Sequence, residues 1–449
     1  MGGKVSPFAV AVGQQVAATL GDPYDDLLRD ARERMLQTFT PAQLEDPGQQ
    51  VLEQARQLLS RMAEGYLLNL QEKGVTVAED AESLVGRLVD DIFGFGPLAR
   101  ILSTETVEEI IINGTEVWVI DAERGKYKAQ VAFRSPQEVI NFVNRVAARQ
   151  GRQLDPSHPK VDAQMSDGSR LNAVMRPIVN NVPVAVTIRR HRMVARRMED
   201  LVRLGTLTEQ AAAFLKACIL GRLNVIVAGG TGTGKTNTLN AFLNVVAEDS
   251  KARFERVLVL EDTPEIDIAN LPDAVSLVTR EANEEGTRAV TMDDLVKNAL
   301  RMRPDRIITG EARGEEIIGI LNAANTGHDG QLLTLHANSA LDVPERIVQM
   351  AQLARDLPER VILGWLANAF DVLVFLRRIT IGDKTLRKVV QIAEIPPSRF
   401  MEGDKLPINV IFEDKGQGLR PVPGAFPQHL EETLYARSGR QVNLRQYLI

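Results

Sequence analysis

The sequence contains one cysteine, few aromatic residues and no long run of apolar residues. The single cysteine, Cys218, excludes an intrachain disulfide and a cysteine-based zinc cluster, and it favours a reducing compartment. No apolar stretch approaches the roughly 20 residues that a membrane-spanning helix requires. We therefore expect a soluble, cytoplasmic protein.

The balance of charge gives little support to a protein held on nucleic acid. Acidic residues (59) outnumber basic residues (53), the formal net charge is −6, and aromatic residues make up 5% of the chain. Proteins that track single strands use basic grooves and stacked aromatic side chains. A local basic patch stays open as an alternative, but we expect no direct contact with nucleic acid.

The length of 449 residues predicts two or three domains. Helical spacing dominates residues 25–88, and short strands with one helix then indicate a smaller α+β domain, in which Asn113-Gly114 marks a hairpin turn. After Leu207, short apolar strands alternate with helical stretches, as in a parallel sheet with crossover helices. The expected segments are a helical region (1–89), an α+β domain (90–193), a basic linker (194–206), an α/β domain (207–400) and a C-terminal extension (401–449).

A glycine-rich segment, Gly229–Thr236, matches the phosphate-binding pattern G-x-x-x-x-G-K-[ST]. A predicted buried strand leads into it and a predicted helix follows it. Glycines let backbone N–H groups surround an anion, and the helix N-terminus adds partial positive charge. Lys235 can then reach the β- and γ-phosphates, and the Thr236 hydroxyl can bind Mg²⁺. A dinucleotide site is excluded, because Lys235 stands where the third glycine of that pattern belongs.

The loop predicts a binding site for ATP and Mg²⁺. The nucleotide-binding residues expected from it are Gly230, Thr231, Gly232, Thr233, Gly234, Lys235, Thr236 and Thr238.

Acidic, basic and histidine side chains follow other predicted strands of the same domain. Glu265 and Glu311 come after two of them, and ligands gather at the carboxyl ends of parallel strands. One acid there is often a helix cap or a solvated residue, but two on one sheet favour catalysis. His336 ends the next strand and His328 precedes it, and either histidine is as readily structural as catalytic. Arg313 is either a surface charge or a γ-phosphate contact delivered across a subunit boundary.

Taken together, these segments resemble the ATPase superfamily of type II and type IV secretion systems, in particular its TadA/CpaF branch, which powers Flp (tight-adherence) pili. The likeness covers roughly residues 90–412 and includes matching segments of the smaller domain. The tetracysteine zinc motif of many type II secretion ATPases is absent. The segments that carry the resemblance are Gly230–Thr236, Glu261–Glu265, Leu300–Arg313, Thr326–Gly330, Thr334–Asn338, Gly94–Leu98, Glu109–Gly114, Val161-Asp162 and Asp167–Arg170.

The resemblance implies an α/β fold: a RecA-like P-loop domain with a mainly parallel sheet, preceded by a smaller α+β (PAS-like) domain and an N-terminal helical region. It implies a homo-hexamer that hydrolyses ATP with Mg²⁺. In this family Glu265 matches the residue that activates the attacking water, and Glu311 matches the residue that supports Mg²⁺ together with Thr236. His328 and His336 match γ-phosphate sensors.

The family likeness also assigns Arg170 and Arg189, in the smaller domain, to a group that closes over the nucleotide. The partner it implies is the inner-membrane platform protein of a pilus or secretion system, which would hold the chain at the inner face of the cell membrane. The leading function is pilus assembly, with or without retraction, or secretion. Conjugative transfer of DNA or protein is the alternative, and a helicase-like or recombinase-like nucleic-acid motor is less favoured.

Overall fold

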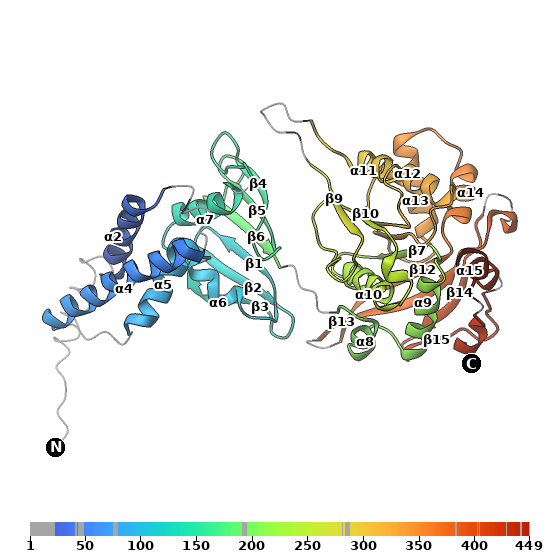
Figure 1. Ribbon diagram of the computed structural model, residues 1–449, viewed down its shortest axis with the longest axis horizontal. Coiled ribbons are helices and arrows are strands. Elements are labelled where there is room, and N and C mark those ends of the chain that lie inside the picture. The colour runs from blue at the N-terminus through green and yellow to red at the C-terminus, as the bar shows by residue number, and fades with distance from the viewer. Residues whose placement is uncertain are drawn as a thin grey trace, which may run out of the picture. The chain divides into compact units, whose positions relative to one another are not determined.

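The computed structural model describes residues 23–40, 43, 49–74, 80–148, 150–190, 195–280, 282, 288–381, 384–401, 403, 405–427, 429–440 and 442–448. The chain divides into two compact units, residues 1–191 and 192–449 (Figure 1). Residues 1–22 of the expected helical region, and Val194 at the start of the expected linker, lie outside the described residues.

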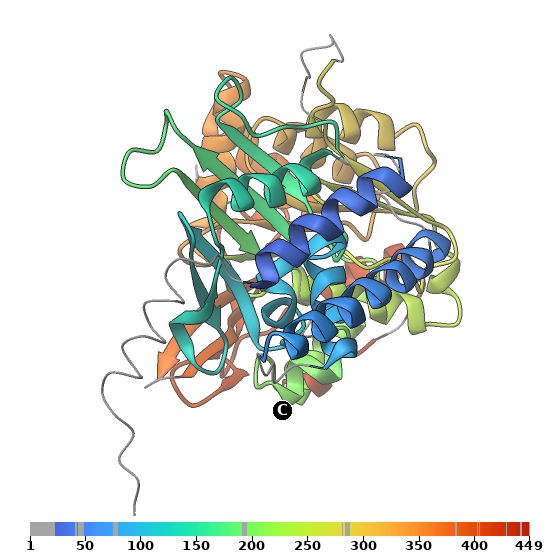
Figure 2. The same cartoon turned by 90° about the vertical axis from the view of Figure 1, so that its left-hand side faces the viewer.

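The first unit begins with a group of helices, α2 (Pro23–Thr38), α4 (Gln49–Glu72) and α5 (Ala81–Phe93), which pack together (Figure 2). Asp80 starts α5 by accepting a hydrogen bond from the Ser83 N–H at 2.8 Å, a typical N-cap contact. Apolar residues of all three helices form one buried cluster. The helical spacing of the sequence in this region is therefore confirmed for the described helices.

The described residues after α5 in the first unit include a six-stranded antiparallel sheet with the order β3-β2-β1-β6-β5-β4. The predicted hairpin is confirmed, since β1 and β2 pair around Gly114, whose φ of +66° favours glycine. A short turn, η1 (Gly96–Leu98) and α6 (Ala99–Leu102), precedes the sheet. The other elements are β1 (Val107–Asn113), β2 (Glu116–Asp121), β3 (Gly125–Ala132), α7 (Pro136–Ala148), β4 (Lys160–Gln164), β5 (Arg170–Met175) and β6 (Val184–Arg189).

The second unit is built on a nine-stranded sheet with the order β15-β14-β13-β12-β7-β11-β10-β8-β9. The run from β12 to β9 is parallel, and the three strands at the other edge are antiparallel. The expected α/β fold with a mainly parallel sheet is confirmed. The strands are β7 (Val225–Gly229), β8 (Val257–Glu261), β9 (Ala274–Val278), β10 (Arg306–Ala312), β11 (Leu332–Leu335), β12 (Val372–Ile381), β13 (Lys384–Glu394), β14 (Asn409–Asp414) and β15 (Leu419–Pro421).

Helices cover both faces of this sheet, so its central strands are apolar on both sides. In β7, Val225 and Val227 join the core under α8–α10, whereas Ile226 and Ala228 join the core under α11–α14 (Figure 1). The helices are α8 (Met198–Arg203), α9 (Glu209–Leu220), α10 (Lys235–Glu248), α11 (Met292–Ala299), α12 (Glu316–Asn325), α13 (Val343–Ala354), α14 (Glu359–Ala369) and α15 (Leu430–Ser438).

Two segments without a recognisable motif belong to this core. The expected linker contains α8, which packs on α10 through a face that buries Met198 and Leu201. The C-terminal extension supplies β14, β15 and α15, and Arg437 of α15 pairs with Asp329 at 2.8 Å and with Asp371. No helix among the described residues has the length and apolarity needed to cross a membrane.

Candidate nucleotide-binding site

The glycine-rich loop joins the end of β7 at Gly229 to the start of α10 at Lys235. Gly234 caps α10 with φ of +95°, in the left-handed region that favours glycine. At Gly229 there is no room for a side chain, because a Cβ there would lie 2.5 Å from the Leu376 carbonyl oxygen of β12. The loop is thus shaped by glycines at both ends and delivers its chain to a helix N-terminus, the usual position of a phosphate site.

Lys235 is 9% exposed and turns its ammonium group back onto the loop. Its Nζ donates to the carbonyls of Gly229 and Gly230, each at 3.1 Å. The same Nζ lies 3.3 Å from His336 Nε2, at the end of β11. The lysine therefore connects the loop to the edge of the sheet where the other candidate residues lie.

Thr236 and Glu265 meet directly, as the Thr236 hydroxyl donates to Glu265 Oε2 at 3.0 Å. Glu265 is held by Glu261, whose Oε1 accepts from the N–H groups of Glu265 (2.9 Å) and Ile266 (3.1 Å). Glu261 is 3% exposed, and it fits because position 310 is glycine: a Cβ there would lie 2.9 Å from Glu261 Cγ. Glu261 thus positions the backbone that carries Glu265.

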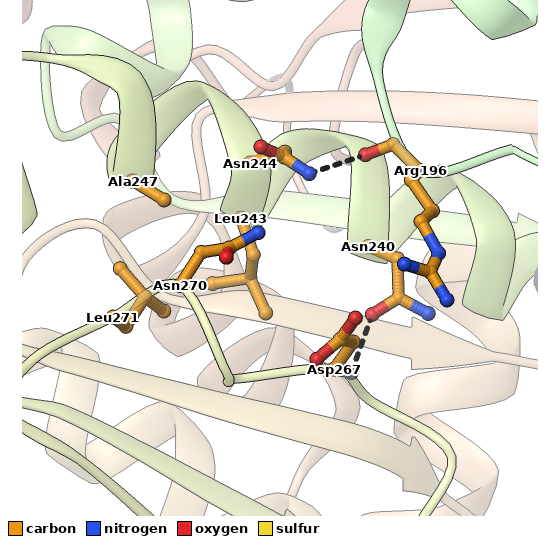
Figure 3. A pocket seen from close by; sticks show the side chains of 8 residues that line it. All are labelled: Arg196, Asn240, Leu243, Asn244, Ala247, Asp267, Asn270 and Leu271. Atoms are coloured by element: carbon orange, nitrogen blue, oxygen red, sulfur yellow. Dashed lines mark hydrogen bonds between the residues drawn. The ribbon is translucent and has the colours of Figure 1, made fainter.

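Asn240 supports the same segment from α10 (Figure 3). Its Oδ1 accepts from the Asp267 N–H at 2.8 Å, and its Nδ2 donates to the Glu265 carbonyl at 3.4 Å. The adjoining cavity, between α10 and this segment, has a volume of about 10 Å³, which is room for about one water molecule. Sequence reasoning missed Asn240, although it stands four residues after Thr236 and hence on the same helix face.

Glu311 lies between a guanidinium and an imidazole. Its Oε2 accepts from Arg313 Nη2 at 2.7 Å, and its Oε1 lies 2.7 Å from His336 Nε2. Burial opposes the charge of this carboxyl, but the hydrogen bond and charge of Arg313 outweigh it, with help from His336 and Lys235, and hold the pKa of Glu311 below its usual value. Glu311 is therefore a carboxylate near neutral pH.

Burial and the nearby charge of Lys235 lower the pKa of His336, against the opposing effect of Glu311. The imidazole is therefore neutral near pH 7. His336 Nε2 lies beside the Glu311 carboxylate, and the Lys235 ammonium lies 3.5 Å from Nδ1 and 3.3 Å from Nε2 of the same ring. Lys235, His336 and Glu311 form a continuous polar chain from the loop to β10.

The structure also describes the surroundings of the remaining predicted site residues. His328 precedes β11 whereas His336 follows it, so the strand separates the two histidines, and His328 Nδ1 lies 3.2 Å from the Ala323 carbonyl. Thr238 is buried, and its hydroxyl donates to the Gly234 carbonyl at 3.0 Å within the start of α10. Arg170 and Arg189 belong to the first unit, where they stand opposite each other on β5 and β6.

The oxygen donors beside the loop fit Mg²⁺. When bound with a nucleotide, this cation takes one or two protein oxygens together with phosphate oxygens and water, and it neutralises phosphate charge. The Thr236 hydroxyl supplies such an oxygen at the start of α10, and the Glu311 carboxylate, which the sequence predicts to support the cation, contacts Arg313 and His336. Within the described ranges, no group of three or more His, Cys, Asp or Glu side chains is arranged to hold a metal ion by itself.

Residues 92–377 match the model of a family described as type II/IV secretion system protein. The chain belongs to this family. Some curated proteins resemble the chain over most of their own length. A Mycobacterium tuberculosis protein provisionally named for conjugal transfer is 34% identical over 336 residues, which cover 73% of this chain and 91% of that protein.

The conjugal transfer protein TrbB of Rhizobium radiobacter is 32% identical over 298 residues, which cover 66% of this chain and 86% of TrbB. Among solved structures, the VirB11 ATPase of the Brucella suis type IV secretion system is 25% identical and covers 69% of this chain and 96% of its own, with a TM-score of 0.35. The family match over residues 92–377 confirms the predicted membership of the type II/IV secretion superfamily. The narrower TadA/CpaF assignment stays a prediction.

Proposed function

We propose that this chain hydrolyses ATP with Mg²⁺ at the glycine-rich loop and uses the energy to drive a pilus or secretion system at a membrane. One observation carries the proposal. The loop residues Lys235 and Thr236 each meet a candidate catalytic group, His336 at 3.3 Å and Glu265 at 3.0 Å. Binding and hydrolysis groups therefore share one edge of the sheet, which a purely structural loop would not need.

The polar contacts suggest how each residue acts. In the nucleotide complex that we propose, the Lys235 ammonium leaves the carbonyls of Gly229 and Gly230 and contacts oxygens of the β- and γ-phosphates. There it neutralises the negative charge that builds up on these oxygens during the reaction. Glu265, fixed next to Thr236, orients and deprotonates the attacking water. Glu311 supports the metal and the water, and neutral His336 detects the γ-phosphate through its contact with Lys235.

Arg313 holds Glu311 in its ionised form, and it is also our candidate for a γ-phosphate contact at a subunit boundary. We propose a homo-hexamer in which Arg170 and Arg189 of the smaller domain close over the nucleotide and open after hydrolysis. The division into segments 1–89, 90–193, 194–206, 207–400 and 401–449 remains part of this proposal. His328 and Thr238 remain proposed site residues as well.

The partner we propose is the platform protein of a membrane system, which would bring the chain to the inner face of the cell membrane. Two versions stand side by side. The TadA/CpaF resemblance favours Flp-type pilus assembly, whereas the relatives named for conjugal transfer favour conjugative or type IV secretion. A nucleic-acid motor is disfavoured by the net charge of −6.

Steady-state ATP turnover tests the proposal. Lys235→Ala and Glu311→Gln should each remove turnover while the circular dichroism spectrum stays that of the wild type. Normal turnover in both variants would contradict the proposal. Light scattering with ATP should give six times the chain mass of 49.5 kDa, and strong stimulation by single-stranded DNA would instead favour the nucleic-acid motor.

A further inference from the structure

The hairpin formed by β12 and β13 contains none of the sequence motifs. It approaches the glycine-rich loop from the β12 side of β7, whereas His336 and Glu311 lie on the β11 side. β12 runs parallel to β7 with Leu376 beside Gly229, so the residues after Leu376 lie at the same edge of the sheet as the loop. In the β12–β13 hairpin, Arg378 stands directly opposite Arg387. The guanidinium groups of Arg378 and Arg387 therefore lie near the loop, although both residues are far from it in the sequence.

Both arginines lie against the loop itself. Arg387 Nε donates to the Gly232 carbonyl at 2.9 Å, and a Cβ on Gly234 would lie 3.5 Å from Arg387 Cδ. A Cβ on Gly232 would lie 3.8 Å from Arg378 Nη1. Arg387 is half-buried and Arg378 is exposed, so the pair forms a basic surface at the rim of the phosphate site.

The order of the strands indicates which part of a nucleotide this surface would meet. β7 lies between β11 and β12. His336 follows β11, and Glu311 lies near the end of β10, so both residues are on the β11 side of β7. The Lys235 ammonium lies 3.3 Å from His336 Nε2, and we therefore place the γ-phosphate on this side. A triphosphate whose γ end lies on the β11 side extends its nucleoside end toward β12.

We propose that Arg378 and Arg387 bind the nucleoside half of ATP, comprising the α-phosphate, ribose and base. A guanidinium suits this role because it pairs with phosphate oxygens through two parallel N–H groups and also stacks on a flat ring. The inference rests on the proposed ATP site and extends it. It makes the hairpin the part of the site that distinguishes a nucleotide from inorganic phosphate compounds.

The hairpin provides its own control. Neighbouring residues of a strand point to opposite faces, so Arg377 and Lys388, which also stand opposite each other, face away from the loop. Arg377 lies 5.9 Å from the Phe375 ring centre, and Lys388 pairs with Asp414 at 3.5 Å. Arg377→Ala removes the same charge from the adjacent position without touching the loop.

Isothermal titration calorimetry of the full chain with ATP and with pyrophosphate, both with Mg²⁺, tests the proposal. Pyrophosphate can occupy the β and γ positions but has no nucleoside. Arg378→Ala and Arg387→Ala should each weaken ATP binding about tenfold, as expected for a lost charged hydrogen bond. Pyrophosphate binding should change less than about twofold in both variants, and Arg377→Ala should leave both affinities unchanged.

Unchanged ATP affinity in both arginine variants would overturn the proposal. Equal weakening of ATP and pyrophosphate would also overturn it, because the arginines would then only hold the loop in shape through the Gly232 carbonyl. Intact pyrophosphate binding also shows that a variant is folded. If the wild-type chain binds neither compound, the proposed ATP site itself fails, which is a different result from either of these.

Discussion

His336 Nε2 lies 2.7 Å from Glu311 Oε1, and the same imidazole lies 3.3 Å from the Lys235 ammonium. A neutral ring thus stands between a carboxylate of β10 and the lysine of the loop. Any movement of the Lys235 ammonium toward a phosphate changes the surroundings of His336, and through it those of Glu311. In the proposed mechanism, this contact would link occupancy of the loop by a nucleotide to Glu311.

The protonation of His336 predicts a pH profile for ATP turnover. Its pKa is lowered by burial and by Lys235, so the proton is bound only below the ordinary histidine value of about 6.5. We expect turnover to be constant between pH 7 and 8 and to fall at a pH lower than that ordinary value. In His336→Gln the fall in turnover at low pH should shift to another pH or disappear. An identical fall in wild type and variant would show that another group titrates.

Asn240 offers a test of the support behind Glu265. Asn240→Ala removes the contacts to the Asp267 N–H and the Glu265 carbonyl, so the segment that carries Glu265 loses its anchor on α10. We expect kcat to fall several-fold with little change in KM. Asn244→Ala, one turn later on α10 and bonded to the Arg196 carbonyl, is the matched control and should keep kcat. Equal losses in both variants would argue for general damage to α10.

A methyl group at position 310 should disturb hydrolysis without disturbing binding. Gly310→Ala places a Cβ 2.9 Å from Glu261 Cγ, so Glu261 must shift and release the Glu265 backbone. We expect turnover to fall at least tenfold, while ATP affinity by calorimetry stays close to wild type.

Gly364→Ala is the control for this substitution, because a Cβ there meets no atom within 4 Å and the residue lies inside α14. It should keep full turnover and raise the free energy of unfolding by about 0.5–1 kcal/mol. Full turnover in Gly310→Ala would mean that Glu261 does not position Glu265.

The C-terminal helix should contribute to stability through Arg437. Burial raises the pKa of Asp371, while the paired Arg437 opposes that rise. Arg437→Met leaves the buried carboxyl without its cation, so we expect urea denaturation to show a loss of about 3–5 kcal/mol at pH 7. The exposed pair of Arg203 with Asp200 is the control, and Arg203→Met should cost less than about 1 kcal/mol.

The same variant has a predictable pH dependence. A carboxyl whose pKa is raised on folding binds its proton more tightly in the folded state than in the unfolded state. Lowering the pH from 7 toward 5 should therefore reduce the difference in the free energy of unfolding between Arg437→Met and wild type. A difference that grows in this range would show that Asp371 is not the source of the loss.

Much of the architecture could be predicted because it depends on local patterns. The hairpin around Gly114 and the strand–loop–helix at Gly229–Thr236 are each encoded by neighbouring residues. The pairing of Thr236 with Glu265 was not predicted, although both residues were proposed for the site, since a contact across 29 positions depends on how β8 and α10 pack.

Other parts of the candidate site depend on long-range contacts that leave no local signal. The Arg387 contact with Gly232 spans 155 positions and follows from the placement of β12 beside β7. His328 and His336 stand close in sequence, yet a whole strand separates them. The C-terminal extension carried no motif, and its contributions to the structure are strand pairing and the ion pairs of Arg437.

The antiparallel edge of the nine-stranded sheet has a practical consequence for anyone shortening this protein. β13 pairs with β14, and β14 is followed by β15. A fragment that stops at residue 400, where the motifs have already ended, would leave the backbone of the long β13 strand without its outer neighbour. Unpaired strand edges invite chains to stick to one another. Recombinant fragments of the second unit should therefore retain the chain through α15.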